Sequence, residues 1–410
     1  MIRVRATSHD ADGVRTALAG ASTVVIDLET TGLHRHDRIV AIGVLINRDA
    51  HILLTDEHRD LSSAGKRAGL KELVQVLAPL TNRTDLVAVF HNAVFDVAML
   101  ERAGVHVNCQ IHDTMKLLKL LDGDRGPEMG DGAGTGTRQP RFERRYKEAL
   151  NYKLKDLAGH LLNVKPLGYP GDPSMLPCDQ LIRYLKSDLL VTHELYAYLQ
   201  RRLTAADWDY NSRLISPITP LLVRMSTGGV VADPGFISAE TNRLLQLMGA
   251  ISDAHAKRFG QRLDVGDYHL RGWIYYRGLR CRLLRSGKKN QPSVRAEDIL
   301  RLHHEAHPPA TRDSLALIHD YKLAQSLMIR LRALGRYVDP NTRRIHSSFN
   351  DFQASGRVSS TRPNLQQIAR QVGAGEKKQF ISDAFRENIV KCRNALQASP
   401  GYKLVALDIA

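Results

Sequence analysis

Two acidic side chains interrupt an apolar stretch near the start of the sequence, where residues 24–33 read VVIDLETTGL. The run of Val, Ile and Leu is typical of a buried β-strand, and alternate residues of a strand point to the same face. Asp27 and Glu29 therefore lie side by side, and their carboxylates repel each other unless a positive charge lies between them. Either a divalent cation takes that place, or the strand presents a polar edge to water. So short a pattern does not decide between the two.

Two later segments carry acidic residues that can approach this pair. HNAVFD, residues 91–96, follows a predicted strand and opens a predicted helix, which puts Asp96 at the carboxyl edge of the sheet. In YLKSD, residues 184–188, the four-residue spacing puts Tyr184 and Asp188 on one helix face. Taken singly, Asp96 fits an acid favoured at a helix N-terminus, and the other two fit a solvated surface pair. Taken together, within the length of one domain, they favour a shared metal site.

The order of these segments resembles that of the 3′ to 5′ proofreading exonucleases that have four acidic ligands and a tyrosine in their third motif. The resemblance covers roughly residues 22–203 and includes HDT at 112–114 and LKDLAGHLL at 154–162. It implies two Mg²⁺ or Mn²⁺ ions, with a ligand set of Asp27, Glu29, Asp96 and Asp188. Hard cations held by carboxylates offset the charge of a phosphodiester, lower the pKa of a bound water and stabilise the leaving 3′ oxygen.

The same resemblance implies further roles. Tyr184 orients the attacking water, Leu33 packs against the terminal base, and Asn92 lies near the substrate. The single-stranded 3′ end of DNA is then the expected substrate.

Charge is spread unevenly along the chain. Lys and Arg number 58 against 43 Asp and Glu, which gives a net charge of +15. Residues 1–205 contain 27 basic and 25 acidic residues, and residues 206–410 contain 31 and 18. The segment 271–295, RGWIYYRGLRCRLLRSGKKNQPSVR, has eight basic residues, no acidic residue and interleaved aromatics. This favours contact with a polyanion over a merely solvated face, so we expect nucleic acid as a partner.

Composition narrows the class of protein. The apolar share of 43% and charged share of 25% are typical of a globular domain. No apolar run reaches the roughly 18 to 20 residues that span a bilayer, and no signal-peptide core follows the first arginines, so a cytoplasmic protein is expected. The four cysteines are scattered without paired spacing, and we expect them to be reduced and structural.

Periodicity predicts an α/β domain, with a mixed sheet flanked by helices, in the first half of the chain. The predicted strands are residues 24–29, 39–46, 51–55 and 86–92, and the predicted helices are residues 70–80, 94–104, 144–162 and 179–203. The Gly-rich segment 122–140 is predicted to be a loop. From residue 208 the pattern is mainly helical, with an amphipathic stretch at 312–334, and strands are predicted at 343–352 and 402–410.

A motif in the second half decides what the nuclease is attached to. ASGRVSSTRPNLQQI, residues 354–368, resembles in spacing and identity a long motif of the family A DNA polymerases. By this resemblance Arg357, Asn364 and Gln366 contact a primer-template duplex near its minor groove. The basic segment falls where the thumb of that family meets the duplex, and its expected contacts are Arg277, Arg280, Arg282, Arg285, Lys288 and Lys289.

The resemblances together imply a ribonuclease H-like exonuclease at residues 1–205, a helical thumb at 206–345, and the start of an α+β palm at 346–410. KLVALDIA, residues 403–410, resembles the palm motif whose aspartate, here Asp408, binds the polymerase metals. The later palm and finger motifs are not found after it in these residues, and we expect no 5′ nuclease domain before the exonuclease. We therefore expect no synthesis by this chain alone and a complementary fragment that carries fingers and the remaining palm, through a split gene, an intervening sequence or truncation.

Two other functions stay open. A stand-alone, ribonuclease D-like exonuclease has the same carboxylates, but residues 354–368 argue against it. A non-catalytic DNA-binding subunit of a split polymerase needs no carboxylate cluster, so the four acids and Tyr184 argue against that.

Overall fold

The structure is a computed structural model, and its elements form two compact units. Unit 1 comprises Met1–Thr227 with Phe349–Ser359, and unit 2 comprises Gly228–Ser348 with Ser360–Ala410. The structure describes residues 11–32, 36–47, 49–59, 69, 72, 75–121, 152–168, 171–286, 290–350, 357–368, 380–385, 388 and 392–405. Within these ranges no helix is both long and apolar enough to cross a membrane.

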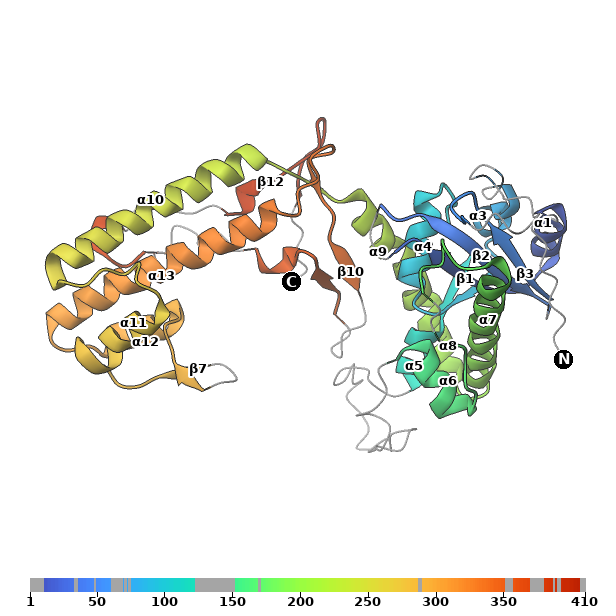
Figure 1. Ribbon diagram of the computed structural model, residues 1–410, viewed down its shortest axis with the longest axis horizontal. Coiled ribbons are helices and arrows are strands. Elements are labelled where there is room, and N and C mark those ends of the chain that lie inside the picture. The colour runs from blue at the N-terminus through green and yellow to red at the C-terminus, as the bar shows by residue number, and fades with distance from the viewer. Residues whose placement is uncertain are drawn as a thin grey trace. The chain divides into compact units, whose positions relative to one another are not determined.

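Unit 1 is built on a five-stranded mixed sheet of order β3-β2-β1-β4-β5 (Figure 1). Its strands are β1 (Thr23–Thr30), β2 (Ile39–Ile46), β3 (Asp49–Leu54), β4 (Val87–Phe90) and β5 (Gln110–Asp113). Strand β1 pairs antiparallel with β2 and parallel with β4, so it lies at the centre of the sheet. The expected α/β fold with a mixed sheet is confirmed.

Helices cover both faces of this sheet. They are α1 (Ala11–Gly20), α3 (Ala78–Asn82), α4 (Ala93–Arg102), α5 (Thr114–Leu121), α6 (Leu154–Leu162), α7 (Cys178–Gln200), α8 (Ala205–Tyr210), the π-helical turn η2 (Asn211–Ile215) and α9 (Ser216–Gly228). Val24, Ile26 and Leu28 belong to the apolar core that includes α4, and Val25 belongs to the core that includes α7. Because side chains alternate along a strand, the face of Val25 is also the face of residues 27 and 29.

Helix α7 lies close against the sheet at Gly43 of β2. Gly43 is the partner of Asp27 in the antiparallel ladder. A Cβ atom at this position would lie 2.8 Å from Leu185 Cγ and 2.8 Å from Leu189 Cδ1, both on α7. The missing side chain therefore lets the helix that carries Tyr184 lie directly against the strand pair that carries Asp27.

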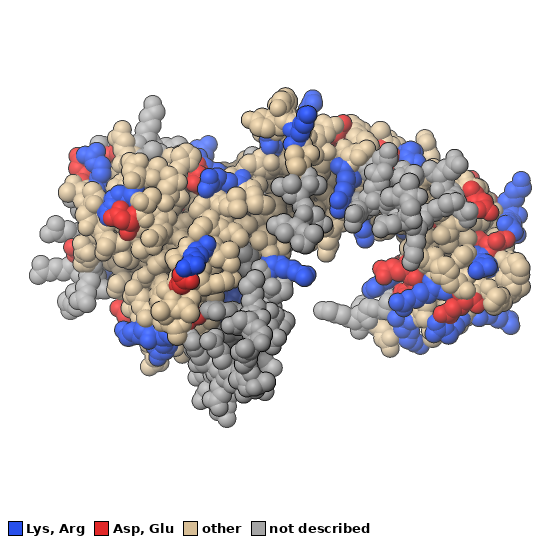
Figure 2. All heavy atoms as spheres, turned by 180° about the vertical axis from the view of Figure 1, so that it is seen from behind, with Lys and Arg blue, Asp and Glu red and all other residues tan. Residues whose placement is uncertain are grey.

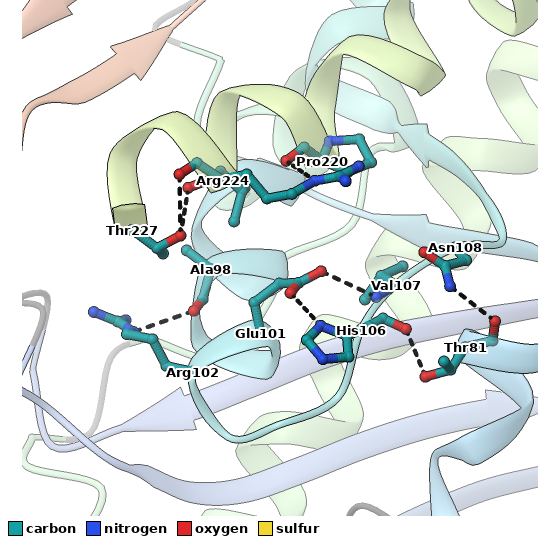
Figure 3. A network of polar contacts seen from close by, with 11 residues as sticks. Thr81, Ala98, Glu101, Arg102, His106, Val107, Asn108, Pro220, Arg224 and Thr227 are labelled. Atoms are coloured by element: carbon teal, nitrogen blue, oxygen red, sulfur yellow. Dashed lines mark hydrogen bonds and ion pairs between the residues drawn. The ribbon is translucent and has the colours of Figure 1, made fainter. Parts of the chain in front are cut away.

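Polar contacts hold the carboxyl-terminal end of α4 (Figure 3). The Val107 amide donates to Glu101 Oε1 over 3.3 Å, and His106 Nδ1 lies 2.7 Å from Glu101 Oε2. The Thr81 hydroxyl donates to the His106 carbonyl over 2.6 Å, and Asn108 Nδ2 donates to the Thr81 carbonyl over 3.1 Å. These bonds tie the loop after α4 to α3 and fix one end of the helix that carries Asp96.

Downstream of residue 228 the described elements are mainly helical, as expected. They are β6 (Val230–Ala232), α10 (Pro234–Phe259), α11 (Asp267–Arg271), the π-helical turn η3 (Gly272–Arg277), β7 (Arg285–Ser286), β8 (Gln291–Pro292), α12 (Ala296–Glu305), α13 (Pro309–Gly335), β9 (Arg344–Ile345), β10 (Ser348–Asn350), β11 (Ser359–Thr361), the 3₁₀ turns η4 (Leu365–Gln367), η5 (Asp383–Phe385) and η6 (Cys392–Ala395), and β12 (Leu396–Gln397). The long helices α10 and α13 run side by side (Figure 1). A small sheet of order β12-β6-β9 joins the late segment to the start of α10.

A buried carboxylate fastens the segment 380–385 to α13. Asp320 is fully buried and accepts hydrogen bonds from the Ile381 amide over 2.8 Å and from the Ser382 amide over 2.9 Å. His319 Nδ1 lies 2.9 Å from Asp320 Oδ1. A buried carboxyl group satisfied in this way is costly to remove, so these contacts stabilise unit 2.

The secondary-structure predictions differ from the structure in a few places. The expected strand at 402–410 is wrong over 402–405, where the chain is irregular, and its remainder lies outside the described residues. Tyr402, Leu404 and Val405 are exposed there, because none of the described strands pairs with them. The loop predicted at 122–140 and residues 144–151 also lie outside the described set. Helix α1 and strand β5 were not predicted.

Replacing Gly43 by Ala should destabilise unit 1, because the added methyl overlaps Leu185 and pushes α7 off the sheet. We expect the free energy of unfolding to fall by about 1 to 3 kcal/mol, the usual cost of overpacking a core. Urea unfolding followed by circular dichroism measures it. Gly20→Ala is the control, because a Cβ there meets nothing within 4 Å; equal effects of the two substitutions would contradict the close packing.

Candidate metal centre

Three carboxylates from two elements meet on the α7 side of the sheet. Asp27 and Glu29 come from β1 and Asp188 comes from α7, and one oxygen of each lies within 4.8 Å of the others. Glu29 is 9% exposed and Asp188 is 7% exposed. Asp188 Oδ1 is buried and has no hydrogen-bond partner among the described residues. Oxygen atoms gathered in this way, with one left unsatisfied, fit a hard divalent cation such as Mg²⁺ or Mn²⁺.

The cluster is electrostatically strained. Burial, followed by the charges of Asp96, Glu29 and Asp188, raises the pKa of Asp27 well above its usual range. Burial and the neighbouring Asp188 raise the pKa of Glu29 to about 8. Burial also raises the pKa of Asp188 itself. Burial thus makes each carboxylate resist ionisation, and neighbouring carboxylates add to this for Asp27 and Glu29. A bound cation removes that penalty.

Asp96 reaches the cluster from the first turn of α4. It is 4% exposed, and its charge is among the causes of the raised pKa of Asp27, although it is not one of the three acids that meet within 4.8 Å. Burial raises its own pKa, and the charge of Asp113 adds to this effect. The structure therefore places all four predicted acids in one region, with three of them in closest contact.

Asp113 fixes the start of α4. Its two carboxylate oxygens accept hydrogen bonds from the Asn92 amide over 3.0 Å and from the Ala93 amide over 2.9 Å. Asn92 adopts the left-handed conformation, with φ of 68°, and this turn aims the helix and Asp96 at the sheet edge. No role for Asp113 was predicted. The sequence feature that could have identified it is an aspartate at the end of β5, because the adjacent strand β4 ends in the turn that starts α4.

Tyr184 and Asp188 share a basic neighbour that sequence reasoning missed. Lys155 of α6 donates a hydrogen bond from Nζ to Tyr184 Oη over 2.7 Å, and Nζ lies 3.8 Å from Asp188 Oδ2. Burial and the charge of Asp188 raise the pKa of Tyr184, so its hydroxyl stays protonated. Lys155 lies in the segment LKDLAGHLL, which the sequence marked without assigning a role to this side chain.

The remaining predicted site residues are placed as follows. Leu33, Lys288, Lys289 and Asp408 lie outside the described residues. Asn92 is exposed at the start of α4. Arg357 and Asn364 are exposed before η4, and Gln366 is exposed within it. Asn364 Oδ1 accepts from the Gln366 amide over 3.1 Å, so one of these side chains caps its own turn.

The basic segment of unit 2 is partly neutralised. Arg277, Arg280, Arg282 and Arg285 are exposed. Arg282 forms an ion pair of 2.7 Å with Glu305, and Arg285 donates to the Asn290 carbonyl over 2.9 Å. Basic and acidic side chains accordingly intermingle over the end of unit 2 that carries α11 and α12 (Figure 2). Glu305, which lies outside the segment, therefore reduces its one-sided charge.

Two family models match successive parts of the chain. The family model for the 3′-5′ exonuclease matches residues 3–204, and that for DNA polymerase family A matches residues 243–410. DNA polymerase I of Treponema pallidum (strain Nichols) is 25% identical over 428 residues, which cover 94% of this chain and 38% of the relative. DNA polymerase I of Pseudomonas aeruginosa is 24% identical over 403 residues, which cover 95% of this chain and 40% of the relative. The chain thus spans about two fifths of the length of these relatives.

A solved structure shares the fold. The chain is similar to a structure described as the POL domain of Pol1 from M. smegmatis in complex with DNA primer-template and dNTP. The TM-score is 0.68 at 16% identity, over 98% of this chain and 59% of that chain. Both resemblances drawn from the sequence are confirmed by the family matches, and the match over residues 243–410 does not favour a stand-alone ribonuclease D-like enzyme.

The raised pKa of Glu29 predicts how stability depends on pH without metal. A carboxyl group with an ordinary pKa of 4.5 and a folded-state pKa of about 8 contributes stability below about pH 4.5 that is lost as the pH rises through 8. In EDTA, Glu29→Gln should therefore be more stable than wild type by about 2 to 4 kcal/mol at about pH 8.5, and nearly equal to it at about pH 5.

Urea unfolding across this pH range measures the effect. Adding Mg²⁺ should stabilise the wild type more than the variant, because a cation that binds the folded state stabilises it. Asp179→Asn is the control, because its side chain is exposed on α7. A wild-type stability that does not fall between about pH 5 and 8.5 in EDTA would contradict the strained cluster.

Proposed function

Because the chain belongs to DNA polymerase family A and carries a 3′-5′ exonuclease domain ahead of its polymerase region, we propose that it is a metal-dependent proofreading exonuclease. The observation that carries this proposal is the meeting of Asp27, Glu29 and Asp188 within 4.8 Å, beside Asp96 and Tyr184. The exonuclease domain is assigned to residues 1–205, the thumb to 206–345 and the start of the palm to 346–410. The substrate is the 3′ end of DNA, and the reaction takes place in the cytoplasm.

The acids that would hold two Mg²⁺ or Mn²⁺ ions are Asp27, Glu29, Asp96 and Asp188. Bound divalent cations supply charge neutralisation for the phosphodiester and a water of lowered pKa. The protein supplies rigidity, because β1 is a central strand and α7 packs directly upon it. A site built on such elements holds its ligands in place against their mutual repulsion.

Tyr184 orients the attacking water rather than deprotonating it. Its raised pKa keeps the phenol neutral, so the hydroxyl offers an oxygen lone pair to a neighbouring water. Asn92 lies at the start of α4, four residues before Asp96, and Leu33 follows β1 by three residues. We propose that these two side chains contact the terminal nucleotide.

Side chains between residues 277 and 366 would bind the duplex from which the 3′ end is drawn. Arginine and lysine side chains pair with phosphates without regard to sequence, and the proposed phosphate contacts are Arg277, Arg280, Arg282, Arg285, Lys288 and Lys289. Arg357, Asn364 and Gln366 are proposed to contact the minor groove, where amide side chains can both donate and accept. The exposure of these three side chains, before and within η4, supports this assignment.

Removing two acids should abolish degradation of DNA. With single-stranded DNA and Mg²⁺, the double substitution Asp27→Ala/Glu29→Ala should lower the rate of nucleotide release from the 3′ end at least about 100-fold, because the cations lose their ligands. Gel analysis of 5′-labelled single-stranded DNA measures it as loss of the product ladder. Asp179→Ala, an exposed acid on the same helix as Asp188, is the control and should leave the rate unchanged. A ladder that persists in the double variant would refute the assignment.

A protein of these 410 residues should not extend a primer. Of the two acidic ligands a polymerase site needs, the resemblance identifies Asp408 alone, and one carboxylate cannot hold two cations and a triphosphate. We propose that fingers and the rest of the palm, on whichever polypeptide carries them, are needed to complete the polymerase site. Primer-template and dNTPs should be given to the Asp27→Ala/Glu29→Ala variant, so that the primer stays intact. Any lengthening of the primer would overturn this proposal.

A further inference from the structure

Lys155 is the one ammonium group whose contacts with the candidate metal centre are resolved among the described residues. Its Nζ donates to Tyr184 Oη over 2.7 Å and to the Leu167 carbonyl over 2.8 Å. The same nitrogen lies 3.8 Å from Asp188 Oδ2 and 4.1 Å from the centroid of the Tyr184 ring. The side chain is 30% exposed, so its position is set by these partners more than by water.

The backbone around Lys155 is held independently of the cluster. Leu157 and Ala158 of α6 are fully buried, which anchors the helix in the core. His91 Nε2, at the end of β4, lies 3.0 Å from the Tyr152 carbonyl just before α6 begins. The ammonium group is therefore brought to Tyr184 by the fold, and the strand-to-helix turn that starts α4 contributes to its placement.

The chemistry of the pair fixes the direction of the phenol proton. An ammonium group has donors and no acceptor, so Tyr184 Oη must accept from Lys155. The phenol has a single proton, which is then left to donate away from Lys155. A hydroxyl rotor that is free to turn becomes one with a defined donor direction. A side-chain hydrogen bond between Tyr184 and Asp188 acts on the pKa of both groups, so the phenol proton is directed to that carboxylate. A water bound beside Tyr184 therefore meets the remaining lone pair of an oxygen whose orientation is fixed.

We propose that Lys155 is a positioning residue of the exonuclease, acting through Tyr184 to hold the attacking water in line. The inference rests on the proposed function. The competing explanation is that Lys155 only balances the charge of the carboxylates and becomes dispensable once cations are bound. The two explanations differ at saturating metal, where a counter-charge is no longer needed but an oriented hydroxyl still is.

Kinetics at saturating Mn²⁺ separate them. Lys155→Met should lower kcat about 10- to 100-fold with KM changed less than about threefold, because misplacement of a reacting group by a fraction of an ångström costs rate rather than binding. Lys155→Arg, which keeps charge and donors, should recover part of the loss. Lys165→Met, which removes an exposed lysine from the loop after α6, is the control and should match the wild type.

A double-mutant cycle tests whether Lys155 acts through Tyr184. In a Tyr184→Phe background, Lys155→Met should cost less than about threefold, because the hydroxyl that it positions is already gone. Full kcat of Lys155→Met at saturating Mn²⁺ would leave Lys155 as a counter-charge and overturn the proposal. Equal losses in both backgrounds would also overturn it.

The contact between Lys155 and Tyr184 can also be tested without substrate or metal, and so independently of nuclease activity. In EDTA, the ¹³Cζ tyrosine resonance of Tyr184, assigned with Tyr184→Phe, should shift in Lys155→Met and stay in place in Lys165→Met. An unshifted resonance would overturn the contact. If Lys155→Met does not fold, Lys155→Leu, which also removes the ammonium group, carries the same comparison. A wild type that lacks metal-dependent 3′ to 5′ activity, with the resonance shifted as expected, would refute the proposed function alone.

Discussion

The repulsion among Asp27, Glu29 and Asp188 is the constraint on which unit 1 depends. Three carboxylate oxygens within 4.8 Å of one another, with little access to water, separate unless the backbone prevents it. The central strand β1 cannot yield, because it is paired on both edges. Helix α7 cannot yield without breaking the contacts of Leu185 and Leu189 with the sheet. Apolar packing therefore holds a polar cluster in a geometry that it would not adopt by itself.

The sequence predicts the members of this cluster better than it predicts their support. Alternation along β1 places Asp27 and Glu29 on one face, and helical spacing places Tyr184 and Asp188 on another, because both rules are local. Gly43 is one small residue in an apolar strand, and only the packed helix shows why no side chain fits there. Asp113 similarly needs the neighbouring strand before its bonds to the start of α4 can be seen.

Contacts between residues distant in sequence also explain which predictions for unit 2 were wrong. The segment 402–405 has the composition of a strand, but a strand forms only against a partner, and none of the described strands provides one. The basic segment 271–295 contains no acid of its own, yet Glu305 neutralises Arg282 from the following helix. Net charge over a window of sequence therefore overstates the positive field at that surface.

The position of Lys155 suggests how the cluster is kept ready for cations. Its charge opposes the rise in the pKa of Glu29 and of Asp188, so it favours the ionised forms that bind metal. The same charge repels an arriving cation, which would make a lysine among the ligands counterproductive. At 3.8 Å from Asp188, and with hydrogen bonds to Tyr184 and the Leu167 carbonyl, Lys155 stands beside the carboxylates rather than between them. Its shortest contact is with the phenol, whereas a side chain that served charge balance alone would bond to a carboxylate first.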